Sequence, residues 1–304
     1  MDNQISLAHE YELKPLIYLI GMVLLVILVA LILSTKDTRR DHSVPTKTAS
    51  HPFPVLSLEA KAVYVYDIRA GKVLFARNED KRLPLASLTK IMSAVVAEES
   101  LPESLAVKVD AEALREDGDS ELLRDERWNF KNLLNFSLVT SSNDGIKAVA
   151  LAFGAASDFV SAMNEKASKL GLKNTYFWNE TGLDESDVKG GAYGSARDFT
   201  RLMSYAWESY PEIFSGTREQ VATFTSLDNK IHTAKNTNDI VGDIPGLLAS
   251  KTGYTSTAGG NLSIIFDPEL GYPIAITVLG SSEEGRFRDM EKLVSASIQY
   301  LSGK

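Results

Sequence analysis

Twenty-one consecutive residues, 15–35, carry no charge and divide the chain of 304 residues into unequal parts. Lys14 and Lys36 bracket this run, and no clear cleavage site of small residues follows it. A helix needs about 20 apolar residues to span a bilayer, whereas the apolar part of a signal peptide has about 7–15. The sequence therefore predicts a retained transmembrane anchor at 15–35, after a short N-terminal tail at 1–14.

The residues after this run predict a spacer and then a folded domain. Residues 36–56 are polar, contain three prolines and show no apolar period, which is typical of an extended linker. Residues 57–304 are long enough for one large domain, or for one domain with an inserted subdomain. Hydrophobic residues make up 44% of the chain and charged residues 24%, as in ordinary globular proteins.

Strand-like runs lie at both ends of this domain, with helical patterns between them. Residues 61–78 indicate a hairpin around an Arg-Ala-Gly turn, and three more strand-like runs occupy 246–254, 259–267 and 272–280. Helical periodicity covers 131–170, 195–209 and 286–302. We therefore predict an α/β (α+β) fold, in which a mainly antiparallel sheet is completed by both ends of the chain, flanked by helices and interrupted by an inserted all-helical subdomain.

The stretch 85–97, LASLTKIMSAVVA, predicts a buried helix that begins at Ser87. Its first turn carries Lys90, and a lysine in a core is costly unless the group has partners or loses its charge. Residues three apart are neighbours on a helix, so the Lys90 amine can reach the Ser87 hydroxyl. Burial and a neighbouring positive charge both lower a lysine pKa, so Lys90 can serve as the neutral base that activates Ser87.

Other catalytic arrangements have less support in the sequence. His232 is the only histidine of the predicted domain, and its setting DNKIHTAKN indicates a polar loop rather than part of a Ser-His-Asp triad. A second Ser-x-x-Lys, formed by Ser186 and Lys189, has no helical pattern behind it, and we assign it to chance. Because the chain has no cysteine and so few histidines, we expect no bound metal and no cofactor.

Two tripeptides follow Ser87 and Lys90 in order. Residues 141–143 are the only Ser-x-Asn of the chain, and residues 251–253 are the only Lys-Thr-Gly. With the stretches NETGLDE and YGSARDFTRLM between them, these motifs resemble the serine D-alanyl-D-alanine carboxypeptidases, the low-molecular-mass penicillin-binding proteins. The resemblance covers about residues 55–300 and implies a β-lactamase/transpeptidase-like fold. Three ordered motifs are far more specific than any one of them.

The resemblance implies catalytic roles for Ser87, Lys90 and Ser141 and a substrate-binding role for Asn143. Ser87 would attack the carbonyl between two terminal D-alanines, and Lys90 would take its proton. Ser141 would relay a proton between Lys90 and the leaving amine, and its hydroxyl would also suit the N-cap of the helix that follows. Asn143 would hold Lys90 and a substrate carbonyl.

The remaining matched residues would bind the substrate. Lys251 and Thr252 would receive its terminal carboxylate, and Lys251 would add a positive field that keeps Lys90 neutral. Gly253 lies on the same strand face as Lys251, and its missing side chain would leave room for substrate close to the backbone. Backbone N–H groups of Ser87 and Tyr254 would form the oxyanion hole.

The sequence thus predicts a membrane-anchored serine D-Ala-D-Ala carboxypeptidase that trims peptidoglycan stem peptides through an acyl-enzyme on Ser87. A β-lactamase or a D,D-endopeptidase on the same fold remains an alternative, although we find no Glu-x-x-Leu-Asn for rapid deacylation. A penicillin or wall-fragment sensor without catalysis is a further alternative. The β-rich second domain and C-terminal amphipathic helix of many relatives have no counterpart in the sequence, and the anchor is expected at the front.

The expected partners are a stem peptide ending in D-Ala-D-Ala, β-lactams as covalent inhibitors, and the bilayer through residues 15–35. A net charge of −8 without a basic stripe argues against nucleic acid. We expect the catalytic domain outside the cytoplasm, where the wall is. The positive-inside rule points the other way, because more lysines and arginines follow the anchor than precede it, but long domains are translocated largely regardless of charge.

Overall fold

The structure, a computed structural model, describes Met22, Phe53 and residues 56–118 and 121–303. The predicted tail, the anchor apart from Met22, and nearly all of the spacer lie outside these residues. Within the described part of the chain, no single helix is long and apolar enough to cross a membrane. Only Asn143–Phe153 and Ala156–Lys169 taken together have the required length and composition, and the two helices are bent by 93°.

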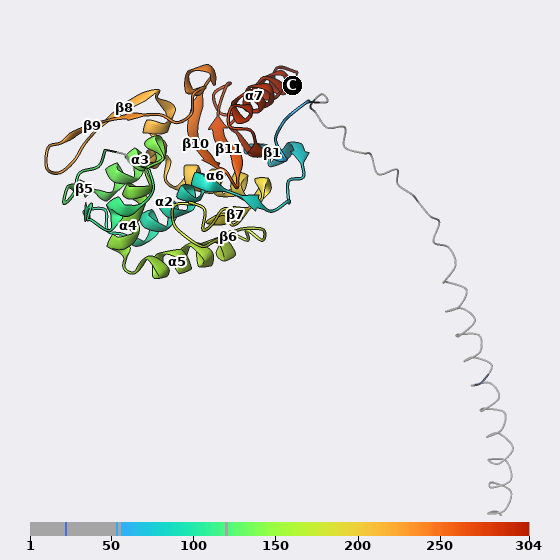
Figure 1. Cartoon of the computed structure of the whole chain (residues 1–304). Coiled ribbons are helices and arrows are strands. Elements are labelled where there is room, and N and C mark those ends of the chain that lie inside the picture. Colours follow the sequence, from blue (N-terminus) through green and yellow to red (C-terminus); the bar gives the residue numbers. More distant parts are fainter. Residues whose placement is uncertain (1–21, 23–52, 54–55, 119–120, 304) are drawn as a thin grey trace, which may run out of the picture. The chain divides into compact units, whose positions relative to one another are not determined.

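A five-stranded antiparallel sheet forms the first part of the domain, in the order β10-β11-β12-β1-β2 (Figure 1). Its strands are β1 (Ala62–Asp67), β2 (Lys72–Arg77), β10 (Leu247–Thr255), β11 (Gly259–Phe266) and β12 (Ile274–Ser281). β1 pairs with β12 in a register that places Ala62 opposite Leu279. The prediction of one sheet completed by both ends of the chain is therefore confirmed.

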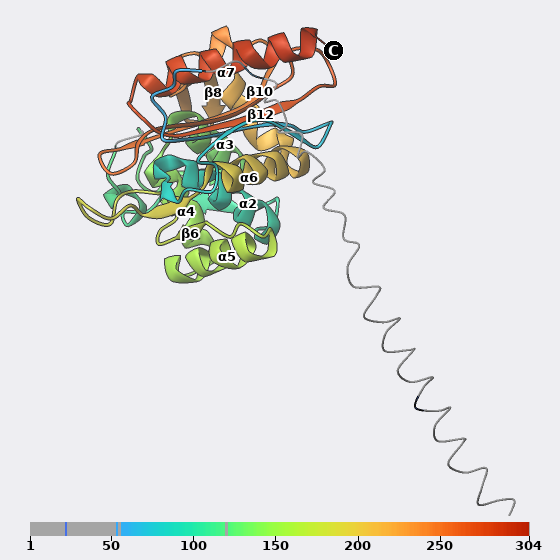
Figure 2. The ribbon, with the colours of Figure 1, turned by 90° about the vertical axis from the view of Figure 1, so that its right-hand side faces the viewer.

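Helices cover both faces of this sheet. Alternate residues of β12 point to opposite faces, so Ile274 and Ile276 lie in the core beneath α7 (Gly285–Ser302), whereas Ala275 and Leu279 lie in the core shared with α6 (Ala196–Ser209). Figure 2 shows α7 above the sheet and α6 below it. Because both faces are covered, β12 is buried throughout its length and reads as a continuous apolar-rich run.

The second part of the domain is built between β2 and β10. Its long helices are α2 (Thr89–Ser100), α3 (Phe130–Thr140), α4 (Asn143–Phe153) and α5 (Ala156–Lys169). Residues 89–97 of α2 are all buried, as expected from the sequence, because this helix contacts α3, α4, α5 and α6. α2 is therefore the central helix of the domain, and it places its first turn next to β10.

The prediction of an all-helical insert is wrong, because the insert contains three small sheets. They are β3 (Leu83–Pro84) with β7 (Ala192–Gly194) and β6 (Tyr176–Phe177), β4 (Ala106–Lys108) with β5 (Arg127–Asn129), and β8 (Val221–Thr225) with β9 (Ile231–Lys235). Most of these strands have two or three residues, too few to show a period of two in a sequence. Short 3-10 turns complete the domain: η1 (Ala86–Leu88), η2 (Ala113–Arg115), η3 (Pro211–Phe214), η4 (Gly216–Arg218) and η5 (Val241–Asp243).

Candidate active site

Ser87 lies in the 3-10 turn η1, just before α2 begins at Thr89. The helix therefore starts two residues later than the sequence predicts, and the preceding Ala86 has a positive φ of 50°. This tight turn still brings the predicted pair together, and Lys90 Nζ lies 2.9 Å from Ser87 Oγ.

Lys90 is completely buried, and three oxygen atoms surround its amine. Besides Ser87 Oγ, Nζ donates to Asn143 Oδ1 at 2.6 Å and to the Thr181 carbonyl oxygen at 2.9 Å. The orientation of the Asn143 amide is fixed from its other end, since Nδ2 donates to the Asp117 carbonyl oxygen. The base is therefore held by one side-chain carbonyl and one backbone carbonyl.

Burial lowers the pKa of Lys90 to about 7. The carboxylates of Glu116 and Glu180 act in the opposite direction and raise this pKa. Of the two causes expected from the sequence, burial is therefore the main one, and the field of Lys251 is not among the contributions to this shift. At neutral pH a substantial fraction of Lys90 carries a free lone pair and can accept a proton.

The Ser-x-Asn motif forms the junction between two helices. Ser141 ends α3 with a left-handed backbone, φ 63°, and Asn143 is the first residue of α4. The N-cap of α4 is Ser142, whose Oγ accepts from the Gly145 N–H at 2.9 Å, so the expected capping role of Ser141 is wrong. The left-handed residue reverses the chain and frees the Ser141 hydroxyl for the cleft.

Lys251, on β10, faces the same cleft from the sheet. Its Nζ donates to Ser141 Oγ at 2.9 Å and to the Thr252 carbonyl oxygen at 2.8 Å. The pKa of Lys251 lies well below its ordinary value because the side chain is buried and the positive charges of Lys90 and Arg286 act on it. Ser141 is thus hydrogen-bonded to Lys251, and its relay to Lys90 stays a prediction.

Gly253 lets β10 approach the nucleophile turn closely. A Cβ at this position would lie 2.9 Å from the Leu85 carbonyl oxygen and 3.2 Å from the Ser87 nitrogen. The missing side chain therefore makes room for the backbone of η1 and not, as predicted, for substrate alone. It also brings the N–H of Ser87 close to the strand that carries Tyr254, where the oxyanion hole is predicted.

Comparisons with known proteins identify the family to which this chain belongs. Residues 46–282 match the family model described as D-alanyl-D-alanine carboxypeptidase. The chain belongs to this family. The carboxypeptidase DacF of Bacillus subtilis is 35% identical over 210 residues, 67% of this chain and 53% of that protein. The D-alanyl-D-alanine endopeptidase of Escherichia coli is 34% identical over 221 residues, 70% of this chain and 67% of that protein. The chain thus spans about half the length of DacF.

Solved structures share the fold of this carboxypeptidase-family chain. A D-alanyl-D-alanine carboxypeptidase of Mycobacterium tuberculosis superposes with a TM-score of 0.73 at 25% identity, over 81% of this chain and 93% of that one. Penicillin-binding protein D2 of Listeria monocytogenes, solved with cefotaxime bound, gives 0.69 at 29% identity, over 81% and 99%. The predicted family and its penicillin-binding fold are confirmed.

Sequence reasoning missed Arg286 in this D-alanyl-D-alanine carboxypeptidase homologue. The guanidinium is buried behind β10 and donates to the Gly253 carbonyl oxygen at 3.0 Å, while its Nε has no hydrogen-bond partner among the described residues. Thr237 was also missed, and its hydroxyl lies 2.6 Å from that of Thr252. An arginine in the first turn of an otherwise amphipathic helix gives no local signal of a site.

His232 is not in a loop of this carboxypeptidase-family domain, as predicted, but in strand β9. It is buried beside Trp128, and its Nε2 lies 2.8 Å from Glu126 Oε1. The pair joins the β8–β9 hairpin to the start of β5. The imidazole is thus hydrogen-bonded to Glu126 and not to Ser87, in keeping with the rejection of a Ser-His-Asp triad.

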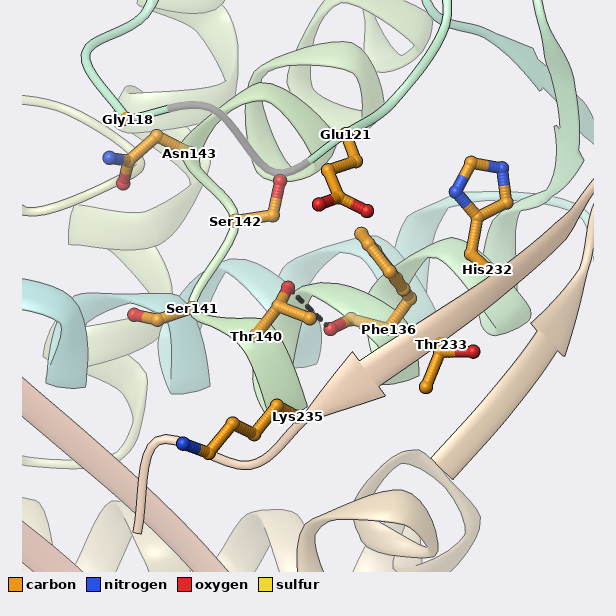
Figure 3. A pocket seen from close by; sticks show the side chains of 10 residues that line it. All are labelled: Gly118, Glu121, Phe136, Thr140, Ser141, Ser142, Asn143, His232, Thr233 and Lys235. Carbon is orange, nitrogen blue, oxygen red and sulfur yellow. Dashed lines mark hydrogen bonds between the residues drawn. The ribbon is translucent and has the colours of Figure 1, made fainter. Parts of the chain in front are cut away.

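A cavity of about 260 Å³ opens beside the Ser-x-Asn motif of this carboxypeptidase homologue. Figure 3 shows Ser141 and Asn143 along one side of it, Glu121 and His232 above, and Lys235 of β9 below. The cavity therefore extends from the Ser-x-Asn motif toward the β8–β9 hairpin, with both signs of charge on its walls.

Proposed function

We propose that this protein is a serine D-Ala-D-Ala carboxypeptidase that works through an acyl-enzyme on Ser87. One observation carries the proposal: Lys90 Nζ lies 2.9 Å from Ser87 Oγ, and burial lowers the pKa of Lys90 to about 7. A serine becomes a nucleophile when a base of suitable pKa takes its proton. Family membership supports a peptide ending in D-Ala-D-Ala as the substrate.

The reaction balances with the groups at hand. Neutral Lys90 takes the Ser87 proton as Oγ attacks the carbonyl carbon of the penultimate D-alanine. The C–O bond forms, the C–N bond to the last D-alanine breaks, and the leaving amine receives a proton through Ser141. Water then attacks the acyl carbon and gives a proton to Lys90, the bond between this carbon and Ser87 Oγ breaks, and Lys90 returns the proton to Oγ. One water is consumed, and D-alanine and the shortened peptide are released.

The sheet side of the cleft supports binding of the substrate carboxylate. Arg286 supplies positive charge there, an incoming carboxylate would raise the depressed pKa of Lys251, and the hydroxyls of Thr252 and Thr237 lie next to each other. Hydrogen bonds to a charged group contribute about 1.5–3 kcal/mol each, so a free terminal carboxylate would be selected strongly.

Covalent labelling tests the nucleophile. The full-length protein in membranes, treated with a fluorescent penicillin, should carry the label on Ser87, as located by peptide mass spectrometry. Ser87→Ala should lose it, while Ser186→Ala, which alters the other Ser-x-x-Lys, should keep it. Labelling that persists in Ser87→Ala contradicts the assignment, and binding that is only reversible supports the sensor.

A D,D-endopeptidase is the second candidate, because two relatives carry that name. Besides the Escherichia coli protein, the D-alanyl-D-alanine endopeptidase of Pseudomonas aeruginosa is 32% identical over 230 residues, 71% of this chain and 72% of that protein. Mass spectrometry separates the two activities. Release of D-alanine from a pentapeptide muropeptide supports the carboxypeptidase, and cleavage of cross-linked dimers alone supports the endopeptidase.

We also propose that residues 15–35 anchor the protein in the membrane, with the catalytic domain outside the cytoplasm. The support is the uncharged length of this run and a wall peptide as the inferred substrate. Protease added to intact spheroplasts should degrade the domain. Full protection until lysis would mean that the flanking charges decide the topology and would contradict the wall-hydrolase role.

A further inference from the structure

A cluster of three charged side chains, of which Glu180 is buried and the other two are partly exposed, lies near Lys90 and lines a second cavity. Lys147 Nζ lies 2.9 Å from Glu180 Oε1 and 3.2 Å from Glu116 Oε1. The side chains of Glu180, Lys147 and Glu116 are only 3%, 16% and 24% exposed. Together they carry one net negative charge, since two carboxylates share one ammonium.

Each member of this ion cluster is close in sequence to a group that holds Lys90. Glu180 precedes Thr181, whose carbonyl oxygen accepts from Lys90 Nζ. Lys147 lies one helical turn after Asn143 on α4. Glu116 precedes Asp117, whose carbonyl oxygen accepts from Asn143 Nδ2. The cluster therefore ties together the three chain segments that surround the amine.

Those three segments determine where the lone pair of Lys90 points. A neutral amine has two N–H groups and one lone pair. Asn143 Oδ1 and the Thr181 carbonyl oxygen can only accept, so they take the two N–H groups. The third neighbour, Ser87 Oγ at 2.9 Å, then faces the lone pair. A shift of either carbonyl would turn an N–H toward the hydroxyl and remove the base.

We propose that the ion cluster Glu116–Lys147–Glu180 positions the two carbonyl oxygens that aim the Lys90 lone pair at Ser87, and sets the electric field around that amine. The inference rests on the proposed acyl-enzyme mechanism. These three are positioning residues, since they act through Asn143, Thr181 and Lys90.

A second contact holds the Glu180–Thr181 segment against α2. Ser93, one turn after Lys90 and completely buried, donates from Oγ to the Glu180 carbonyl oxygen at 2.6 Å. The two peptide carbonyls of residues 180 and 181 are thus bonded to the same face of α2. Ser93 thus holds the backbone of residue 180 in place, while the Glu180 carboxylate pairs with Lys147.

The field of the cluster has a definite sign. Two carboxylates, Glu116 and Glu180, act on Lys90 directly. Lys147 is paired with both carboxylates, and Lys251 interacts with Lys90 from β10. The two carboxylates raise the pKa of Lys90, and Lys147 must oppose them because its charge has the other sign. Removing one carboxylate should therefore lower the pKa of Lys90, and removing the Lys147 ammonium should raise it. A purely structural ion pair makes no such prediction.

The test is the pH dependence of acylation of the full-length protein by a fluorescent penicillin. Glu180→Gln should move the acid limb of the rate profile to lower pH by about 0.5–1 unit, and Lys147→Met should move it to higher pH by a similar amount. Both should lower the plateau rate by about 10–100-fold, because the carbonyl oxygens shift. Lys166→Met is the matched control, since Lys166 is 15% exposed and pairs with Glu99 far from the cleft, and it should leave the profile unchanged.

Serine variants separate the positioning part from the field. Ser93→Ala should lower the plateau without moving the acid limb. Ser297→Ala, which removes an equally buried helical hydroxyl of α7 bonded to the Leu293 carbonyl, should change neither. Glu116→Gln changes the most exposed member of the cluster and preserves the buried pair, so it serves if the other variants fail to fold. It should also shift the acid limb to lower pH, by at least as much as Glu180→Gln, because the carboxylate of Glu116 raises the pKa of Lys90 more than that of Glu180 does.

Two results would overturn the inference. Shifts of the acid limb in the same direction for Glu180→Gln and Lys147→Met would refute the field, and unchanged plateau rates in folded variants would refute the positioning. Either failure is distinct from failure of the proposed function, which would appear as a wild-type protein that is not labelled at Ser87.

Discussion

The candidate site has a helical wall, formed by α2 and α4, and a sheet wall, formed by β10. Each wall contributes one buried lysine, but the surroundings of the two lysines differ. On the helical wall Lys90 lies among carbonyl oxygens and two nearby carboxylates. On the sheet wall Lys251 is acted on by the positive charges of Lys90 and Arg286. Burial lowers both pKa values, but neighbouring charge offsets the effect on the first wall and increases it on the second.

This difference separates two tasks that the same side chain can perform. The surroundings on the helical wall hold the pKa of Lys90 at about 7, near physiological pH. Such a pKa suits a group that must gain and lose a proton in each catalytic cycle. The sheet wall gathers cations that would be stabilised by an incoming anion. The helical wall therefore suits the base, and the sheet wall suits a carboxylate.

Arginine at each lysine position gives the largest expected contrast. Lys90→Arg keeps a cation but cannot accept a proton, so acylation should fall by about 10²–10⁴-fold. Lys251→Arg keeps the charge that a carboxylate needs and should cost about 10-fold or less. Both are measured as the second-order rate of penicillin labelling. Similar losses for the two variants would mean that the walls are not specialised.

The pH profile of the wild-type protein gives the next largest effect. Because only neutral Lys90 accepts a proton and its folded-state pKa is about 7, acylation should rise about tenfold per unit below pH 7 and level off above it. Stopped-flow labelling between pH 5 and 9 measures this limb. A midpoint of the rate profile near pH 10 would mean that burial does not lower the pKa of Lys90. Lys90 would then be no better suited than Lys251 to act as the base.

Alanine substitutions of two glycines test how tightly the backbone is packed around the Ser87 turn. Gly182 has φ +83°, and a Cβ there would lie 2.0 Å from the Ala86 carbonyl oxygen, so Gly182→Ala should lower the free energy of unfolding by at least about 2 kcal/mol. Gly253→Ala meets the Leu85 oxygen at 2.9 Å and should cost about 1 kcal/mol while slowing acylation about 10-fold. Urea unfolding measures the loss of stability, and the rate of penicillin labelling measures the loss of acylation. Equal free energies of unfolding for the two variants would contradict the prediction that Gly182→Ala is the more destabilising.

Proton uptake gives the smallest effect. A carboxylate bound beside Lys251 should raise its depressed pKa, so binding at pH 7 should take up a fraction of a proton and weaken as the pH rises. Calorimetry of Ser87→Ala with a D-Ala-D-Ala peptide, in buffers of different ionisation enthalpy, measures this fraction. The same peptide with a C-terminal amide should take up none, and equal uptake by both peptides would exclude the carboxylate as the cause.

The main features of the fold and the core of the site were predictable, because each leaves a local mark in the sequence. The strands have apolar runs bounded by Gly and Pro, and Lys90 is a charge inside a run that is otherwise apolar. Asn143 and Lys251 were found because their tripeptides occur once each, in order. These features are encoded within a few neighbouring residues.

The rest depends on contacts between distant segments. Strand β9 has a period of two, but with Ile231 exposed and His232 buried, because Glu126 of another strand region pairs with the imidazole. Arg286 and the ion cluster near Lys90 likewise become meaningful only once β10, α4 and residues 179–182 are placed together. Glu180 reads as an ordinary polar residue until its neighbours are known.

The pairing of β1 with β12 has a consequence for biosynthesis. Ala62 and Leu279 are neighbours in the sheet, but β12 is made long after β1 as the chain is synthesised. Until the last strand emerges, the β1–β2 hairpin lacks its partner, and a lone hairpin is only marginally stable and has an open edge. Contacts so far apart in sequence form slowly. A chain without β10 to β12 thus has its serine and lysine but not the β10 wall, so the hydrolase should remain silent until these strands are made, and the unpaired edge of the β1–β2 hairpin is where a chaperone would be needed.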